Sequence, residues 1–126
     1  GLRYSNVFGL NEDHKKNRAS MISQILWMMR VSDRIQLFKF GDQKRDWVYI
    51  KDVVDFNRRL MDLDCNYKIM NYGSGRTASI NQIAKTIGDV LGVDYDIDYV
   101  DCPFDGMIQK NTELDLSRSK EFGHMA

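Results

Sequence analysis

Residues 1–9 read GLRYSNVFG. The segment from Leu2 to Val7 is mostly apolar or aromatic, and Gly9 follows it closely. A short apolar run that ends at a glycine is typical of a well-buried strand. We therefore expect residues 2–7 to form an interior strand.

The rest of the chain alternates predicted helices with predicted strands. Apolar residues recur at helical spacing over 19–31, after an N-cap candidate at Asp52, and after Ser79. Ser79 and Gln82 have the spacing of a capping box, and Gly92 stands where a helix ends. Strands are predicted at 35–40, 47–50, 67–72 and 95–100, a loop at 11–17, and a last short helix at 114–122. This alternation predicts an α/β or α+β fold, with residues 1–126 in a single domain.

Composition and charge exclude several classes of protein. The chain has 126 residues, 43% of them hydrophobic, and 18 basic residues balance 18 acidic ones. A net charge of zero does not favour nucleic acid or an acidic membrane surface as a partner. We see neither a membrane-spanning apolar run nor a signal peptide. Cys65 and Cys102 lack metal-ligand or redox spacing, so we expect two reduced thiols, no metal site and a cytoplasmic protein.

A cluster of basic residues precedes the first predicted helix. His14, Lys15, Lys16 and Arg18 crowd this loop. Cations beside a helix N-terminus can bind an anion, and cations that crowd one another lower a lysine pKa toward the range useful for acid–base chemistry. The alternative is a solvated basic loop.

Arg45 is a second candidate, because a guanidinium can hold a diphosphate with two parallel hydrogen bonds. The alternative is a surface ion pair with Asp46 or Asp42. The Gly73-Ser74-Gly75 segment resembles a phosphate-binding loop only in part, since the third glycine of a dinucleotide fingerprint is missing. A tight turn between a strand and a helix explains it better.

Five segments together resemble a known family. They are LRYSNVFG (2–9), HKKNRAS (14–20), LFKFGDQKRDWVYIKDVV (37–54), NYGSG (71–75) and NTELDLSRS (111–119). Their order and spacing are similar to those of extended short-chain dehydrogenase/reductases, in the NAD-dependent epimerase/dehydratase family. The His-Lys loop is most similar to the branch of ADP-L-glycero-D-manno-heptose 6-epimerases, which supply lipopolysaccharide precursors.

The resemblance implies a fold and a reaction. The fold would be the C-terminal, substrate-binding part of an extended short-chain dehydrogenase/reductase, without the N-terminal Rossmann domain. The family oxidises a carbon of a nucleotide-activated sugar by hydride transfer to NADP or NAD, then returns hydride to the opposite face. We find neither the Tyr-x-x-x-Lys pair nor the Gly-rich cofactor loop in the sequence. We therefore expect neither tight cofactor binding nor activity from this chain alone.

Site residues follow from the resemblance position by position. Asn6 matches a residue that contacts the substrate, and Arg45 matches the arginine that holds its diphosphate. Phe38 opens the segment that lines the nucleotide pocket. Lys15 matches a lysine proposed as a catalytic acid or base, and both Val7 and Lys15 are expected to border the cofactor.

Some positions depart from the family pattern. Asn17 stands where the heptose enzymes have a substrate-binding serine, and Gln24 where they have a histidine. Ile108 replaces a tyrosine of the nucleotide pocket. Because Asn17 and Gln24 can still form hydrogen bonds, we retain both as substrate-binding candidates.

Three functions remain open at this stage. The first is a truncated nucleotide-sugar epimerase, inactive alone, with an ADP-sugar as the favoured ligand. The second is a stand-alone module that binds nucleotide sugars or diphosphates without catalysis. The third is a non-catalytic interaction domain that forms a homodimer, with the Met21–Met29 stripe as the expected contact.

Overall fold

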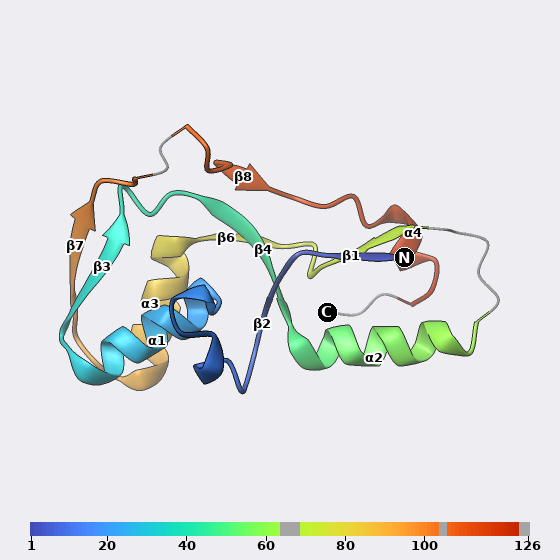
Figure 1. The fold of residues 1–126 in the computed structure, drawn as a ribbon, viewed down its shortest axis with the longest axis horizontal. Coiled ribbons are helices and arrows are strands. Elements are labelled where there is room, and N and C mark those ends of the chain that lie inside the picture. Colours follow the sequence, from blue (N-terminus) through green and yellow to red (C-terminus); the bar gives the residue numbers. More distant parts are fainter. Residues whose placement is uncertain (64–68, 104–105, 124–126) are drawn as a thin grey trace. The chain divides into compact units, whose positions relative to one another are not determined.

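The structure is a computed structural model that describes residues 1–63, 69–103 and 106–123. These residues form two compact units, each assembled from alternating segments of the chain (Figure 1). Unit 1 contains the described residues of 1–11, 45–77 and 112–126, and unit 2 those of 12–44 and 78–111. Cys65 and the first residues of the strand predicted at 67–72 lie outside the described part of the chain. The mixture of helices and parallel strands confirms the predicted α/β class.

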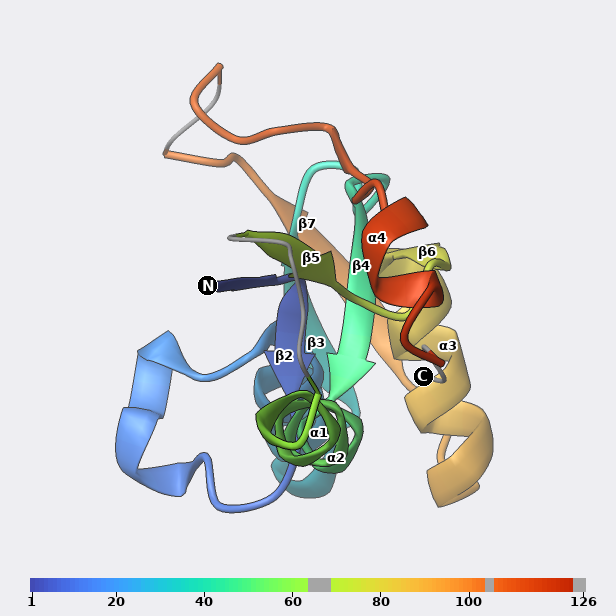
Figure 2. The same ribbon diagram turned by 90° about the vertical axis from the view of Figure 1, so that its right-hand side faces the viewer.

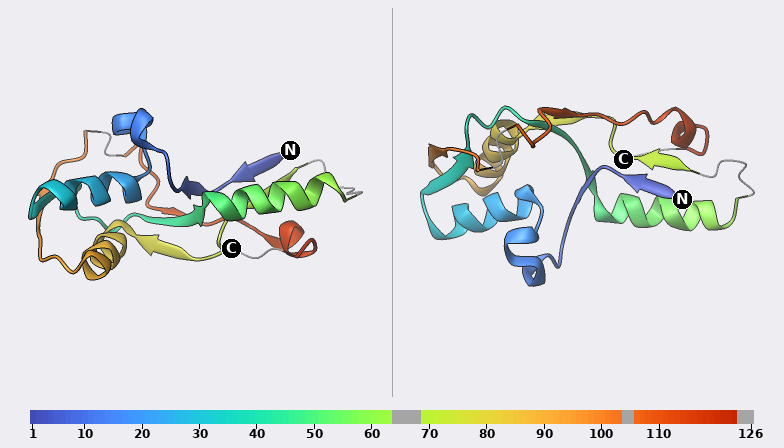
Figure 3. Two further views of the ribbon diagram at one scale, coloured as in Figure 1. Left: turned by 90° about the horizontal axis from the view of Figure 1, so that it is seen from below. Right: turned by 45° about the horizontal axis from the view of Figure 1, so that its top comes forward.

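Unit 1 is built from two pairs of parallel strands and a long helix. Strand β1 pairs with β5, with Leu2 opposite Met70 and Tyr4 opposite Tyr72 (Figure 3). Strand β2 pairs with β4, with Asn6 opposite Trp47 (Figure 2). The elements are β1 (Leu2–Tyr4), β2 (Asn6–Phe8), β4 (Lys44–Tyr49), α2 (Ile50–Met61), β5 (Met70–Tyr72) and α4 (Ser117–Lys120).

Strand β4 has further partners in its sheet, β6 (Thr77–Ser79) and β8 (Asn111–Thr112). The sequence did not predict β6 or β8. All three of these strands contain a point at which the chain passes from one unit to the other.

The core of unit 1 joins α2 to the strands. Val53 and Phe56 lie three residues apart on α2, and both are buried against Val48 of β4 and Tyr72 of β5. Residues at this spacing share one face of a helix. The apolar pattern after residue 52 therefore predicted the first part of the buried face of α2 correctly, whereas Leu63, the last residue of that pattern, lies beyond α2 and is exposed.

The structure corrects several predicted boundaries in unit 1. The strand expected at 47–50 is β4 (Lys44–Tyr49), and α4 covers only Ser117–Lys120 of the helix expected at 114–122. The single strand expected at 2–7 is two strands, because the chain leaves β5 at Ser5 and then pairs with β4. The helix expected to start at an Asp52 cap begins at Ile50, directly after β4, with Tyr49 as its N-cap. Asp52 instead lies in the first turn, where the positive end of the helix dipole stabilises a carboxylate.

Unit 2 packs two helices beside a pair of parallel strands. Strand β3 pairs with β7, with Ile35 opposite Ile97 and Leu37 opposite Tyr99 (Figure 1). Ile35 and Leu37 are buried while their neighbours in β3 are exposed, as the alternation of a strand requires. The elements are a 3₁₀ segment η1 (Asp13–Arg18), α1 (Met21–Val31), β3 (Arg34–Phe38), α3 (Ile80–Leu91) and β7 (Asp96–Val100).

Helix α1 begins two residues later than expected, because Ser20 is its N-cap and accepts a hydrogen bond from the Ser23 amide at 3.3 Å. Ile25 and Met29 of α1 are buried, and α1 packs on α3 and β3. Part of the methionine stripe is therefore core. The loop expected at 11–17 is largely the 3₁₀ segment η1.

Both predicted ends of α3 are confirmed. Ser79 Oγ accepts the Gln82 amide at 3.2 Å, and Gln82 Oε1 accepts the Ser79 amide at 2.8 Å, which completes the capping box. Gly92 adopts φ 65°, the left-handed conformation that closes many helices. Gly88 has no room for a side chain, since a Cβ would stand 2.5 Å from the Tyr95 ring.

Candidate functional site

A buried carboxylate organises the part of unit 1 around Arg45. The Asp46 side chain is fully buried on β4 and accepts hydrogen bonds from the amides of Ser74 and Gly75 at 2.7 and 3.0 Å. It also accepts bonds from the hydroxyls of Ser74 at 2.8 Å and Ser5 at 3.3 Å. Four donors satisfy a charge that would otherwise be costly to bury. Asp46 is therefore not the surface carboxylate that the ion-pair alternative for Arg45 requires.

The Gly73-Ser74-Gly75 segment is the receptor for this carboxylate. Its amides point at Asp46, as the amides of an anion-binding loop point at a phosphate. A Cβ at Gly73 would stand 2.5 Å from Asp46 Oδ2 and 2.8 Å from Ser5 Oγ, so glycine is required by space. The segment is the tight turn that we expected after β5, and its amides are occupied by the chain's own side chain.

Asn6 and Val7 lie next to this centre on β2. The Asn6 side-chain amide donates to the Asp46 carbonyl at 3.2 Å. Val7 is opposite Val48 and packs on the core of unit 1. Arg45 precedes Asp46 on β4 and is half-buried. Because successive side chains of a strand leave on opposite sides, Arg45 projects away from the buried side that Asp46 occupies.

A second buried carboxylate organises the loop of unit 2 that carries Lys15. Glu12 accepts hydrogen bonds from the Ser20 amide and hydroxyl, both at 2.8 Å, and from the Ser23 hydroxyl at 2.9 Å. It also forms an ion pair with Lys15, whose Nζ lies 3.4 Å from Oε2. The loop is thereby tied to the first turn of α1.

Three predicted site residues of unit 2 lie on this loop and helix. Lys15 remains 46% exposed despite its ion pair. The Gln24 side-chain amide donates to the carbonyls of Asn17 at 3.3 Å and Ala19 at 2.7 Å. The structure thus brings Gln24 to the backbone of Asn17, and Glu12 to Lys15.

Phe38, the last predicted site residue of unit 2, ends β3 beside a polar and aromatic cluster. Asn81 donates to the Phe40 carbonyl at 2.8 Å and accepts the Tyr99 hydroxyl at 3.0 Å. The rings of Phe40 and Tyr99 lie 6.2 Å apart. Gly41 follows with φ 71°, and a Cβ there would collide with the Asn81 amide. Asn81 therefore sets the loop that follows β3.

Glu12, Asp46 and Asn81 were missed as site residues by the sequence analysis. Asp46 and Glu12 are acidic and Asn81 is polar, and residues of these types usually lie at the surface, so the sequence carried no signal that singled them out. Their importance depends on donors supplied by other segments of the chain.

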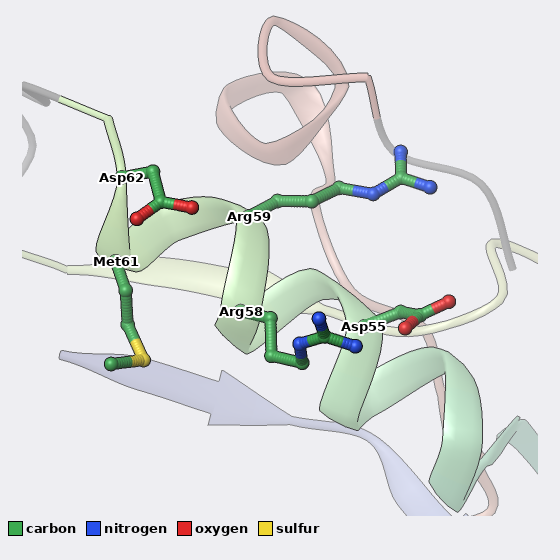
Figure 4. Close-up of a pocket in the computed structure, with 5 residues that line it drawn as sticks. All are labelled: Asp55, Arg58, Arg59, Met61 and Asp62. Carbon is green, nitrogen blue, oxygen red and sulfur yellow. The ribbon is translucent and has the colours of Figure 1, made fainter.

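Two hollows in unit 1 lie beside α2. One, of about 440 Å³, is lined by Asp55, Arg58, Arg59, Met61 and Asp62 (Figure 4). Its lining comes from α2, from Asp55 onward, and from the residue after the helix, and Arg59 and Met61 point to different sides of the helix. The other, of about 180 Å³, lies beside Tyr72 and Phe56. Neither includes a predicted site residue.

The described residues contain neither a helix that could span a membrane nor a group of side chains that could hold a metal ion. No helix among them is long and apolar enough to cross a membrane. Within the same residues, no three His, Cys, Asp or Glu side chains are placed to hold a metal ion.

Comparison with known proteins relates this chain to a family of epimerases and dehydratases. Residues 1–73 match the NAD dependent epimerase/dehydratase family. The chain is 34% identical to the ADP-L-glycero-D-manno-heptose-6-epimerase of Alkalilimnicola ehrlichii, an alignment that covers 98% of this chain and 41% of that enzyme. Identity to the Brachyspira hyodysenteriae enzyme of the same name is 32%, with 98% and 40% covered. The chain thus spans about 40% of the length of these curated relatives.

Comparison with solved structures relates the chain to the same family. The ADP-L-glycero-D-manno-heptose-6-epimerase of Helicobacter pylori superposes with a TM-score of 0.87 at 32% identity, covering 99% of this chain and 38% of that one. The UDP-glucose 4-epimerase of Thermotoga maritima, solved with UDP-glucose, gives 0.86 at 30% identity, with 98% and 39% covered. The fold is that of the C-terminal part of extended short-chain dehydrogenase/reductase epimerases. With more than half of its residues matched by the family and relatives aligned over nearly its whole length, this chain belongs to the NAD-dependent epimerase/dehydratase family.

Proposed function

We propose that this chain is the substrate-binding part of an NAD(P)-dependent nucleotide-sugar epimerase, with an ADP-sugar as the favoured ligand. The observation that carries the proposal is the alignment of 98% of the chain with ADP-heptose epimerases at 34% identity. The arrangement around Arg45 supports it, because a half-buried guanidinium next to a fixed backbone loses little freedom when it binds a diphosphate.

In unit 1, Arg45 holds the diphosphate and Asn6 contacts the substrate. Each has a chemical reason: the guanidinium presents paired donors to phosphate oxygens, and the amide of Asn6 can donate and accept. Asn6 already uses one donor on the Asp46 carbonyl, which leaves its side-chain oxygen for a sugar hydroxyl.

In unit 2, Lys15 acts as the acid or base, Asn17 and Gln24 bind the sugar, and Phe38 lines the nucleotide pocket. Lys15 is suited to move a proton, because its amine is partly exposed while Glu12 keeps it close to the loop. Phe38 is 37% exposed and offers an aromatic surface to a ligand.

The nicotinamide cofactor supplies hydride transfer when it is bound to enzymes of this family. Val7 and Lys15 are the residues of this chain proposed to border it. Among the described residues, the Gly73–Gly75 turn does not fit a cofactor phosphate, since the amides of Ser74 and Gly75 already bind Asp46. We therefore propose that the chain alone does not turn over substrate. The cytoplasmic location expected from the sequence stays a prediction.

Calorimetric titration of the chain with ADP-, GDP- and UDP-sugars tests this function. We expect an ADP-sugar to bind and Arg45→Ala to weaken binding by about tenfold or more, the effect of losing a charge-assisted contact. Arg58→Ala is the matched control, because it removes an arginine from unit 1 at the hollow of Figure 4. No heat with any nucleotide sugar, or equal losses in the two variants, would contradict the proposal.

A turnover assay with NADP separates the epimerase from a stand-alone binding module. Turnover by this chain would contradict our expectation that it is inactive alone. Binding without turnover agrees with both functions, and restored turnover upon adding the cofactor-binding domain of a relative would favour the epimerase.

A further inference from the structure

We propose that Asp46 is a positioning residue, which holds the side chains of Arg45 and Asn6 in the orientation needed to bind a diphosphate. This inference rests on the function proposed above for Arg45 and Asn6. Asp46 itself touches no ligand in this account, because its carboxylate is fully buried and directed into the Gly73–Gly75 turn.

The Asp46 carboxylate first fixes the orientation of β4 about the strand axis. Four hydrogen bonds at 2.7 to 3.3 Å pull the Asp46 carboxylate to the buried side of the strand. A strand cannot turn one side chain inward without turning its neighbour outward. The carboxylate therefore decides on which side of β4 the Arg45 guanidinium emerges.

The second step is the coupling to Asn6. The Asn6 amide donates to the backbone carbonyl of Asp46, and Asn6 is aligned with Trp47 on the neighbouring strand. Ser5, directly before Asn6, donates its hydroxyl to the Asp46 carboxylate. Asp46 is thus linked to both predicted ligands: it follows Arg45 on β4, and it bonds to Ser5 and Asn6.

The third step is the chemistry of the receptor. Within the described residues, the four groups that bond to the Asp46 carboxylate are all N–H or O–H donors. A carboxylate accepts on both oxygens, whereas an asparagine places an NH₂ group where one oxygen was. In Asp46→Asn, the side-chain NH₂ group would therefore face the backbone N–H of Ser74 or Gly75, so that two donors meet. The volume of the side chain changes little.

The experiment compares Asp46→Asn with Ser119→Ala. Ser119 is also fully buried in unit 1, but its hydroxyl donates to the Leu116 carbonyl at 3.0 Å and to none of the groups that bond to the Asp46 carboxylate. Three quantities are measured for each variant: the thermal midpoint, the dissociation constant for ADP-glucose, and the ¹H–¹⁵N signals of the Arg45 Nε–H and the Asn6 side-chain amide.

Asp46→Asn is expected to weaken ADP-glucose binding by about tenfold and to move both side-chain signals, because small displacements of a positioning group are costly. Ser119→Ala is expected to lower the thermal midpoint while it leaves the affinity within about twofold, because it removes no hydrogen bond to Asp46, Asn6 or Arg45. Wild-type affinity in Asp46→Asn, or an equal loss in Ser119→Ala, would overturn the proposal.

Two further measurements cover the cases in which Asp46→Asn does not fold or the wild-type chain does not bind ADP-glucose. If Asp46→Asn does not fold, Ser5→Ala removes only the 3.3 Å contact, and unchanged affinity and signals in that variant would overturn the inference. If the wild-type chain does not bind ADP-glucose, the function proposed for Arg45 is contradicted. The positioning role is then judged by the Arg45 and Asn6 signals alone, and signals that stay in place in Asp46→Asn would refute it.

Discussion

The ring of Phe56 is stacked on the ring of Tyr72, with centroids 4.1 Å apart and the planes inclined by 14°. Phe56 belongs to α2 and Tyr72 to β5, and both side chains are almost completely buried. This pair joins the helix to the parallel strands in the core of unit 1. Stacked aromatic pairs contribute beyond the apolar area that they bury.

Replacement of Phe56 should destabilise the protein strongly. Phe56→Ala leaves a cavity against Tyr72, so we expect the free energy of unfolding to fall by about 3 to 5 kcal/mol. Urea denaturation followed by circular dichroism measures the change. Val54→Ala, at a 50% exposed position of the same helix, is the control and should alter the free energy by about 0.5 kcal/mol or less. A small effect of Phe56→Ala would show that the stacked pair does not hold the core.

Tyr72 should make stability fall at alkaline pH. Burial, with a smaller contribution from Asp52, raises the pKa of the Tyr72 hydroxyl above its usual value of 10.0. The folded protein then holds this proton at a pH where the unfolded chain has lost it. Its contribution to stability is complete below pH 10 and is lost as the pH rises through the folded-state pKa.

Thermal midpoints of the wild type and Tyr72→Phe between pH 7 and 11 test this dependence. Near neutral pH, Tyr72→Phe loses the hydrogen bond to the Asp52 carbonyl, so its midpoint should be lower. Above pH 10 the midpoint of the wild type should fall more steeply than that of the variant. Parallel curves would argue against the raised pKa.

The capping box of α3 should contribute measurably to stability. Ser79→Ala removes the acceptor of the Gln82 amide, and we expect a loss of about 1 kcal/mol in the free energy of unfolding. Val90→Ala, at an 80% exposed position of α3, serves as the control. If Ser79→Ala behaves like Val90→Ala in urea denaturation, the cap carries no net stability.

Glu12 should hold the loop that carries Lys15. Glu12→Gln keeps the size of the side chain but removes a charge that binds the Ser20 amide and the hydroxyls of Ser20 and Ser23. We expect a loss of about 2 kcal/mol, typical of a buried hydrogen bond to a charged group.

Amide hydrogen exchange of Ser20 measures the local effect of Glu12→Gln, and its protection should drop. Asp13→Asn is the control, because Asp13 is an exposed neighbour on the same segment. Equal protection in the wild type and in Glu12→Gln would mean that other contacts hold the loop.

Helices were easier to predict than strands in this chain, for a physical reason. The signals of α3 at Ser79, Gln82 and Gly92 act within one or two turns of the chain, so they can be read locally. The division of residues 2–7 into β1 and β2 could not be read in that way. It depends on β5 and β4 as partners, and each of them comes from a distant part of the sequence.

The candidate site shows the same difference between residues with a local signal and residues that depend on distant partners. Arg45 and Lys15 could be singled out because their side chains suggest a chemistry and their motifs resemble a family. The supports of the two residues, Asp46 and Glu12, could not be recognised, because acidic residues usually lie at the surface.

The sequence by itself determined the α/β class, the faces of the main helices and membership of the epimerase/dehydratase family, since all three depend on local patterns and ordered motifs. Only the tertiary structure decided that Asp46 and Glu12 are interior anchors of the backbone. A carboxylate can be buried only where several N–H and O–H donors converge on it, and these donors come from separate segments that folding brings together.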